Sequence, residues 1–110
     1  MTVDILYFEG CPHSEVARDR VREAFASERV AGGVRMVEVS DAQDALARHF
    51  LGSPTIQIDG VDVEPEARLR RDYGFMCRTY ETPAGLAGVP PLQLVADAIR
   101  ERLSTALPCA

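Results

Sequence analysis

Hydrophobic and polar residues alternate in several short stretches of the chain, as is typical of β-strands with one buried face. We predict four such strands, over residues 3–8, 34–39, 55–58 and 61–64. Asp59-Gly60 separates the last two, and a two-residue Asp-Gly link is a strong hairpin signal, so these strands should be antiparallel. A helical pattern separates the first two, which should therefore be parallel and joined by a right-handed crossover.

Apolar residues recur at helical spacing in three other stretches. We expect helices over residues 18–29, over residues 40–52 and from residue 90 onwards. Ser40 and Gln43 have the spacing of a capping box at the start of the second helix, and Leu46 and Phe50 belong to its apolar stripe. The order β-α-β-α-β-β-α predicts an α/β sandwich of helices against a sheet.

Residues 65–89, called the insertion below, show no sustained hydrophobic period. A connection of that length in a compact domain is usually functional or disordered. Tyr73, Phe75 and Tyr80 make this one too aromatic for a disordered linker, and Glu66–Arg71 is predicted to form a short helix. We therefore expect a single domain, residues 1–110, in which the insertion packs as a lid-like segment.

Composition and charge exclude several classes of function. The net charge of −5 argues against a nucleic-acid partner, which would require a basic face. All twelve basic residues are arginines, so Schiff-base chemistry and a Walker-type phosphate loop are excluded. No apolar stretch is long enough for a membrane helix, and the N-terminus lacks the pattern of a signal peptide, so we expect a cytoplasmic protein.

The cysteines carry the candidate chemistry. Cys11, Cys77 and Cys109 are an odd number without an export signal, which favours reactive thiols over a disulfide scaffold. Cys11 lies between the first strand and the first helix, with Pro12 at the expected first helical position. A sulfur there is close to free N–H groups and to the positive end of the helix dipole, and both favour the thiolate. The competing interpretation is a small buried cysteine at the end of a loop.

Two motifs resemble the thioredoxin and glutaredoxin superfamily: the Cys11-Pro12-His13-Ser14 turn, and Ser53-Pro54-Thr55 before a later strand. The resemblance implies a thioredoxin-like fold, with a central four-stranded mixed sheet flanked by helices, into which residues 65–89 would be inserted between the last strand and the last helix. It also implies that Pro54 follows a cis peptide bond and lies against the reactive sulfur. An X-Pro bond is otherwise trans in roughly nineteen of twenty cases.

A closer resemblance is to a family of small bacterial thioredoxin-like proteins, some of them named alkylmercury lyase-like. It is carried by the Cys-Pro-His turn, residues 50–55, Gly74–Tyr80 with its Cys77-Arg78-Thr79-Tyr80 motif, and residues 85–90. The family implies that Cys11 acts together with Cys77, delivered by the insertion. Ser14 departs from the family, in which a bulky aromatic residue is expected. Cys109 near the C-terminus is expected to be incidental, on a frayed tail.

Three chemistries stay open for Cys11, because Ser14 occupies the place of the second thiol in a two-cysteine thioredoxin motif. Cys11 acts as a monothiol with glutathione as co-substrate, or pairs with Cys77, or binds a soft metal such as mercury with Cys77 as second ligand. No resident cofactor is expected. Ser14 either donates a hydrogen bond to the thiolate or caps the first turn. His13 and His49 have no metal-ligand spacing.

The first functional hypothesis is a thiol–disulfide oxidoreductase with Cys11 as nucleophile and Cys77 as resolving thiol. Its disulfide or small-thiol substrate would contact Pro12, His13, Ser14, Ser53, Pro54, Thr55 and Arg78. Arg78 and the nearby Arg68, Arg70 and Arg71 are candidates for binding an anionic group such as a glutathione carboxylate. The second hypothesis is an organomercurial-binding or lyase-like protein that uses the same thiols, with Glu9 or Asp62 as acid. The third is a non-catalytic interaction module. The protein is expected to be a monomer or homodimer.

Overall fold

The fold is taken from a computed structural model that describes residues 1–106, with side chains through residue 104. Four strands form one mixed sheet in the order β2-β1-β3-β4, with bounds Thr2–Tyr7 (β1), Gly33–Glu38 (β2), Thr55–Ile58 (β3) and Val61–Asp62 (β4). β1 is parallel to β2 and antiparallel to β3, and β3 and β4 form an antiparallel hairpin. The predicted directions of these strands are confirmed, while β4 ends at Asp62, two residues earlier than predicted.

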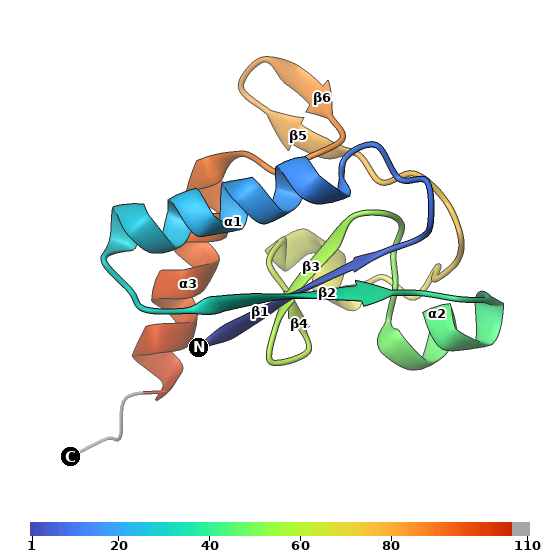
Figure 1. The fold of residues 1–110 in the computed structure, drawn as a ribbon, viewed down its shortest axis with the longest axis horizontal. Helices are drawn as coiled ribbons and strands as arrows, with labels where there is room; N and C mark the ends of the chain where they lie inside the picture. Colours follow the sequence, from blue (N-terminus) through green and yellow to red (C-terminus); the bar gives the residue numbers. More distant parts are fainter. Residues whose placement is uncertain (107–110) are drawn as a thin grey trace.

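Two long helices cover one face of the sheet (Figure 1). They are α1, Ser14–Glu28, and α3, Leu92–Ala106. The alternation of β1 decides what they cover, because Val3 and Ile5 point into the larger core while Leu6 points to the other side. The larger core joins the sheet to both helices through buried apolar residues that include Val21, Phe25, Ile56, Val95 and Ile99.

The short helix α2, Ala42–Arg48, packs beside a smaller core that contains Leu6, Val39, Ala45 and Phe50. The predicted capping box is wrong: Asp41 is the N-cap, and its carboxylate accepts a 2.7 Å hydrogen bond from the backbone N–H of Asp44. The helix ends at Arg48 because His49 adopts the left-handed conformation. Phe50 therefore lies beyond the helix, and Leu46 is 63% exposed instead of lying on a buried stripe.

The insertion contains more regular structure than predicted. Its short helix is a 3-10 helix over Pro65–Leu69, and residues 80–87 add a hairpin of β5, Tyr80–Thr82, and β6, Gly85–Ala87. This hairpin lies beside the start of α1, apart from the main sheet (Figure 1). Strands of three residues carry too little periodicity to be found in a sequence.

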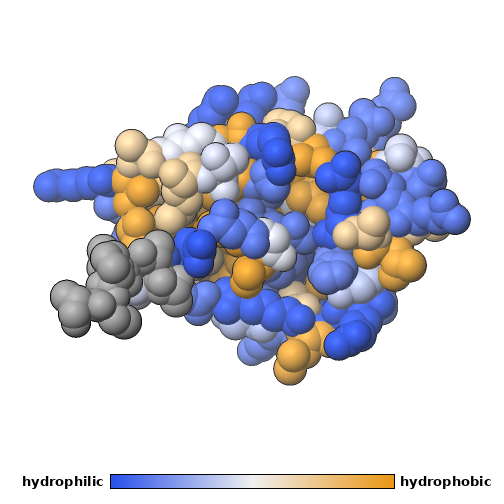
Figure 2. Space-filling view, turned by 90° about the horizontal axis from the view of Figure 1, so that it is seen from below, coloured by the Kyte–Doolittle hydropathy of each residue, from blue (hydrophilic) through white to orange (hydrophobic). Residues whose placement is uncertain are grey.

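The surface seen from below Figure 1 is largely hydrophilic, with hydrophobic residues in small separate patches (Figure 2). Within residues 1–106, no helix combines the length and the apolar character needed to span a membrane. The expectation about Cys109 lies outside the described residues.

Candidate active site at the carboxyl end of β1

The turn that carries Cys11 connects β1 to α1. The backbone N–H of Cys11 donates a 3.2 Å hydrogen bond to the carbonyl oxygen of Phe8, and the thiol is free and half-buried. The helix begins at Ser14 with His13 as N-cap, so the prediction that Pro12 is the first helical residue is wrong. Gly10 in the left-handed conformation closes the turn before the helix starts. The N-terminus of α1, which was expected to act on Cys11, thus lies two residues further along the chain than predicted.

The hydroxyl of Ser14 donates a 3.3 Å hydrogen bond to the carbonyl oxygen of Cys11. In this structure the hydroxyl is therefore used by the backbone of Cys11 and not by its sulfur. The ring of His13 meets the far end of the insertion, because a Cβ atom added to Gly88 would lie 2.5 Å from that ring. The Cys11 turn is thus in contact with the segment that follows β6.

The Ser53–Pro54 peptide bond is cis, as the resemblance implied. Leu6 in β1 is the register partner of Thr55 in β3. Because the two strands are antiparallel, the start of β3 lies at the sheet edge where β1 ends and the Cys11 turn begins. Ser53 and Thr55 are 1% and 0% exposed, and the hydroxyl of Ser53 has no hydrogen-bond partner among the described residues. The resemblance-based expectation that Pro54 lies against the Cys11 sulfur stays a prediction.

The insertion brings Cys77 to the same edge of the sheet. Ser53 donates its backbone N–H to the carbonyl of Met76 at 2.9 Å and accepts the N–H of Arg78 at 3.1 Å, so it forms an isolated parallel bridge with Cys77. The Cys77 thiol is free and exposed. This close backbone approach requires Gly52, because a Cβ atom there would lie 3.0 Å from the carbonyl oxygen of Met76.

An aromatic cluster joins this part of the insertion to the Cys11 turn. The ring of Phe75 stacks on Phe8 with a centroid distance of 5.8 Å and an interplanar angle of 27°. Both rings meet Phe50 edge-on, at 6.4 Å from Phe8 and 6.1 Å from Phe75. Phe75 precedes Cys77 by two residues, and Phe8 is hydrogen-bonded to Cys11 through the backbone. The two thiols are therefore held in neighbouring segments by ring packing.

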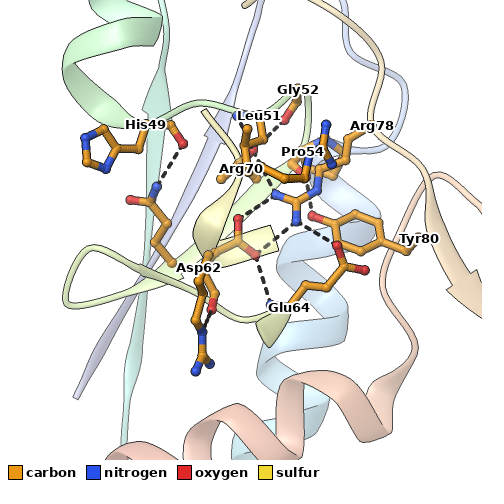
Figure 3. Close-up of polar contacts among 12 residues, drawn as sticks. His49, Leu51, Gly52, Pro54, Asp62, Glu64, Arg70, Arg78 and Tyr80 are labelled. Carbon is orange, nitrogen blue, oxygen red and sulfur yellow. Dashed lines mark hydrogen bonds and ion pairs between the residues drawn. The ribbon is translucent and has the colours of Figure 1, made fainter. Parts of the chain in front are cut away.

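Arg78 points into the protein, toward Asp62 and Glu64 (Figure 3). Its side chain is 1% exposed, and its guanidinium donates to the Asp62 carboxylate at 2.7 and 3.0 Å and to Glu64 at 3.3 Å. Burial lowers the pKa of Arg78, but the hydrogen bonds to Asp62 and the surrounding negative charges raise it above its ordinary value. The arginine expected to contact an anionic substrate group is therefore paired internally.

Tyr80 completes this buried network. Its ring lies 4.6 Å from the Arg78 guanidinium, and its hydroxyl donates a 2.6 Å hydrogen bond to the carbonyl oxygen of Pro54 (Figure 3). Burial raises the pKa of the phenol above its ordinary value. Sequence reasoning missed this network, although a signal was present. Thr55, Gln57 and Asp62 are polar residues on one face of the β3–β4 hairpin, which indicates a polar partner for that face.

The other candidate arginines are also dispersed. Arg68 pairs with Glu101 at 2.8 Å, and Arg70 pairs with Asp72 at 2.7 Å. Arg71 is exposed. The basic cluster that was expected around Cys77 is thus largely neutralised by carboxylates of the same chain, which removes much of the support for a glutathione carboxylate site.

A groove of about 570 Å³ lies beside Cys77. It is lined by Phe8, Glu9, Glu38, Val39, Ser40, Phe75, Met76 and Cys77. We call it the acidic groove, because its charged lining residues are Glu9 and Glu38. Sequence reasoning missed the contribution of residues 38–40, although Glu38 ends β2 and the other two follow it, and the carboxyl ends of β1 and β2 meet at the same edge of the parallel pair.

Among the described residues, no group of three or more His, Cys, Asp and Glu side chains is arranged to hold a metal ion. The acidic groove does bring a carboxylate, Glu9, next to one of the two thiols. Comparisons of the chain with protein-family models, with curated proteins and with solved structures found no match. The chemistry of the site is therefore inferred from its own residues.

Proposed function

We propose that the chain has a thioredoxin-like fold and acts as a thiol–disulfide oxidoreductase. The strand order β2-β1-β3-β4, the helices on both faces and the cis Pro54 before β3 support this fold. The observation that carries the function is the pairing of Ser53 with residues 76–78. It brings an exposed second thiol to the sheet edge where the Cys11 turn begins.

The reaction proceeds in two exchange steps. The Cys11 thiolate attacks one sulfur of a substrate disulfide, so that a Cys11–substrate disulfide forms and the other substrate sulfur leaves as a thiolate. Cys77, as thiolate, then attacks the Cys11 sulfur, which releases the second substrate thiol and leaves a Cys11–Cys77 disulfide. The substrate gains two electrons, and an external dithiol returns the protein to its reduced form. A cytoplasmic location suits a cycle that starts from the reduced protein.

Peptide mapping by mass spectrometry after mild oxidation tests this proposal. Trypsin cuts after Arg18, Arg71 and Arg78, so Cys11 and Cys77 fall in separate peptides, residues 1–18 and 72–78. A Cys109→Ala background removes the third thiol. We expect a crosslinked pair of these peptides that disappears on reduction and in the Cys11→Ser and Cys77→Ser variants.

Two results would contradict the proposal. If Cys11 forms only mixed disulfides with added glutathione while Cys77 stays reduced, the protein is a monothiol enzyme. If neither thiol reacts faster than a free cysteine under the same conditions, the protein is a non-catalytic interaction module.

The location of Glu9 supports a second candidate function. Cleavage of a carbon–mercury bond requires two thiolates to hold mercury and an acid that protonates the leaving carbon. Glu9 and Cys77 line the same groove. In this reaction Hg(II) of the substrate exchanges its carbon ligand for a second thiolate, and the proton of Glu9 goes to the carbon.

Incubation with an alkylmercury compound separates the two candidates. The lyase activity is supported if the wild type releases the hydrocarbon and the Glu9→Gln variant does not. Binding of mercury without hydrocarbon release contradicts it and leaves the oxidoreductase proposal unaffected.

A further inference from the structure

We propose that the acidic groove binds an extended peptide segment of a protein substrate, in which an apolar residue and an arginine or lysine lie next to the reacting cysteine. This inference deepens the proposed function by naming its substrate class. It rests on three independent properties of the groove: its apolar floor, its charge and its neighbouring strand edge.

The floor of the groove is apolar and accessible. Its volume of about 570 Å³ falls within the range that is usual for ligand sites. Phe75 is 49% exposed although its ring stacks on Phe8, and Val39 is buried beneath. A large aromatic ring held in place by packing offers an apolar contact area at little entropic cost. An aliphatic side chain next to the substrate cysteine fits this floor.

The charge of the groove is negative. Glu9 and Glu38 are both exposed, and no basic side chain is among the lining residues of this groove. Arg78 follows Cys77 directly, but its guanidinium is buried against Asp62. A basic residue beside the substrate cysteine is therefore attracted, whereas glutathione, which carries two carboxylates and one ammonium group, is repelled.

The strand edge beside the groove favours a peptide over a small molecule. Among the described strands, β2 has a hydrogen-bonded neighbour on one side only. Gly33 and Val39 donate their N–H groups to β1 residues Met1 and Tyr7. In a parallel ladder every second residue bonds to the same neighbour, so the alternate residues Val34, Met36 and Glu38 point their N–H and C=O groups away from β1. The peptide groups of Glu38 thus face the open edge, where an extended segment can add as a strand.

Fluorescence anisotropy with short labelled peptides tests the inference. All peptides carry serine in place of cysteine, so that binding requires no disulfide exchange. One peptide contains Leu-Arg before the serine, a second Leu-Glu and a third Ser-Arg. We expect the Leu-Arg peptide to bind at least about tenfold more tightly than either of the others, with the charge preference lost near 1 M salt.

Variants of the groove provide the matched controls. The Glu9→Lys/Glu38→Lys double variant should prefer the Leu-Glu peptide. Glu23→Lys/Glu66→Lys changes the net charge equally at two exposed positions outside the groove and should keep the original preference. Phe75→Ala should weaken binding of both leucine peptides, while Leu86→Ala, which removes a 72% exposed side chain elsewhere, should not.

Three results would overturn the inference. Equal binding of the three peptides would show that the groove does not select charge and apolarity. Equal effects of the groove and control double variants would show that the preference for the Leu-Arg peptide depends only on the net charge of the protein. Sedimentation that shows a dimer lost in Phe75→Ala would make the groove an interface between two copies. None of these results depends on Cys11 or Cys77, so they leave the oxidoreductase proposal to be judged by the disulfide map alone.

Discussion

The hydroxyl of Tyr80 donates a 2.6 Å hydrogen bond to the carbonyl oxygen of Pro54. This bond connects the last residue of the Cys77-Arg78-Thr79-Tyr80 motif to the residue that directly precedes β3. The phenol ring is fully buried and lies beside the Arg78 guanidinium. The conformation of the segment around Cys77 therefore depends on groups in the interior of the protein.

Replacing Tyr80 by phenylalanine should lower the free energy of unfolding by about 1–2 kcal/mol, because the buried Pro54 carbonyl loses its donor. Urea denaturation of both proteins measures this difference. Tyr73→Phe is the matched control, since Tyr73 is half-buried and stacks on His49 through its ring. A loss for Tyr73→Phe as large as that for Tyr80→Phe would contradict the assignment.

Stability should fall at alkaline pH partly because of Tyr80. Burial raises the pKa of this phenol in the folded state. The protonated phenol therefore contributes fully to the free energy of unfolding below the unfolded tyrosine pKa of about 10. That contribution is lost as the pH rises from there through the folded-state pKa. The free energy of unfolding, measured against pH, should decline more steeply for the wild type than for Tyr80→Phe. Parallel curves would show that Tyr80 is not the responsible group.

Removing Arg78 from its ion pair with Asp62 should cost about 3–5 kcal/mol, because the Asp62 carboxylate stays buried without its partner; removing Asp62 should cost less, since Arg78 keeps Glu64 at 3.3 Å. Arg78→Met and Asp62→Leu test this separately by chemical denaturation. The double variant should be more stable than at least one of the single variants, since no buried charge is left from the pair. Additive losses in the double variant would contradict the coupling.

Replacing Gly52 by alanine should slow formation of the Cys11–Cys77 disulfide. Gly52 has a φ of 112°, and an added Cβ atom would lie 3.0 Å from the carbonyl oxygen of Met76, which pushes the Cys77 segment away from Ser53. The rate of disulfide formation, followed by thiol quantification after mixing with oxidant, measures the effect. Gly74→Ala is the control, because it has open space around the added Cβ atom and ordinary φ. Equal rates in the two variants would disprove the role of Gly52.

Much of the sheet was predictable because its signals are local. The alternation in β1 and the Asp59-Gly60 turn determine their strands through neighbouring residues. The capping of α2 was not predictable, since Ser40 and Asp41 both have capping side chains and only the folded chain decides between them. The internal pairing of Arg78 was also missed. The polar face of the β3–β4 hairpin indicated a polar partner, but Asp62 lies 16 residues from Arg78 and no short-range pattern identifies that partner.

Cys11 and Cys77 were proposed as the candidate thiols from the sequence, whereas the acidic groove was not predicted. Its lining comes from the turn that follows β1, from the end of β2 with the two residues after it, and from the insertion, which are far apart in the chain. The stacking of Phe75 on Phe8 connects the insertion to the Cys11 turn, and no sequence pattern indicated this contact.

The direct succession of Cys77 and Arg78 has a mechanical consequence. Arg78 is anchored in the interior by Asp62 and through its backbone by Ser53, so Cys77 directly precedes a residue that a buried ion pair and a backbone hydrogen bond hold in place. The Cys11 turn contains Gly10 in a left-handed conformation, with open space around it. In the proposed exchange between the two sulfurs, we therefore expect Cys77 to stay in place while the Cys11 turn, with the substrate attached to its sulfur, moves toward it.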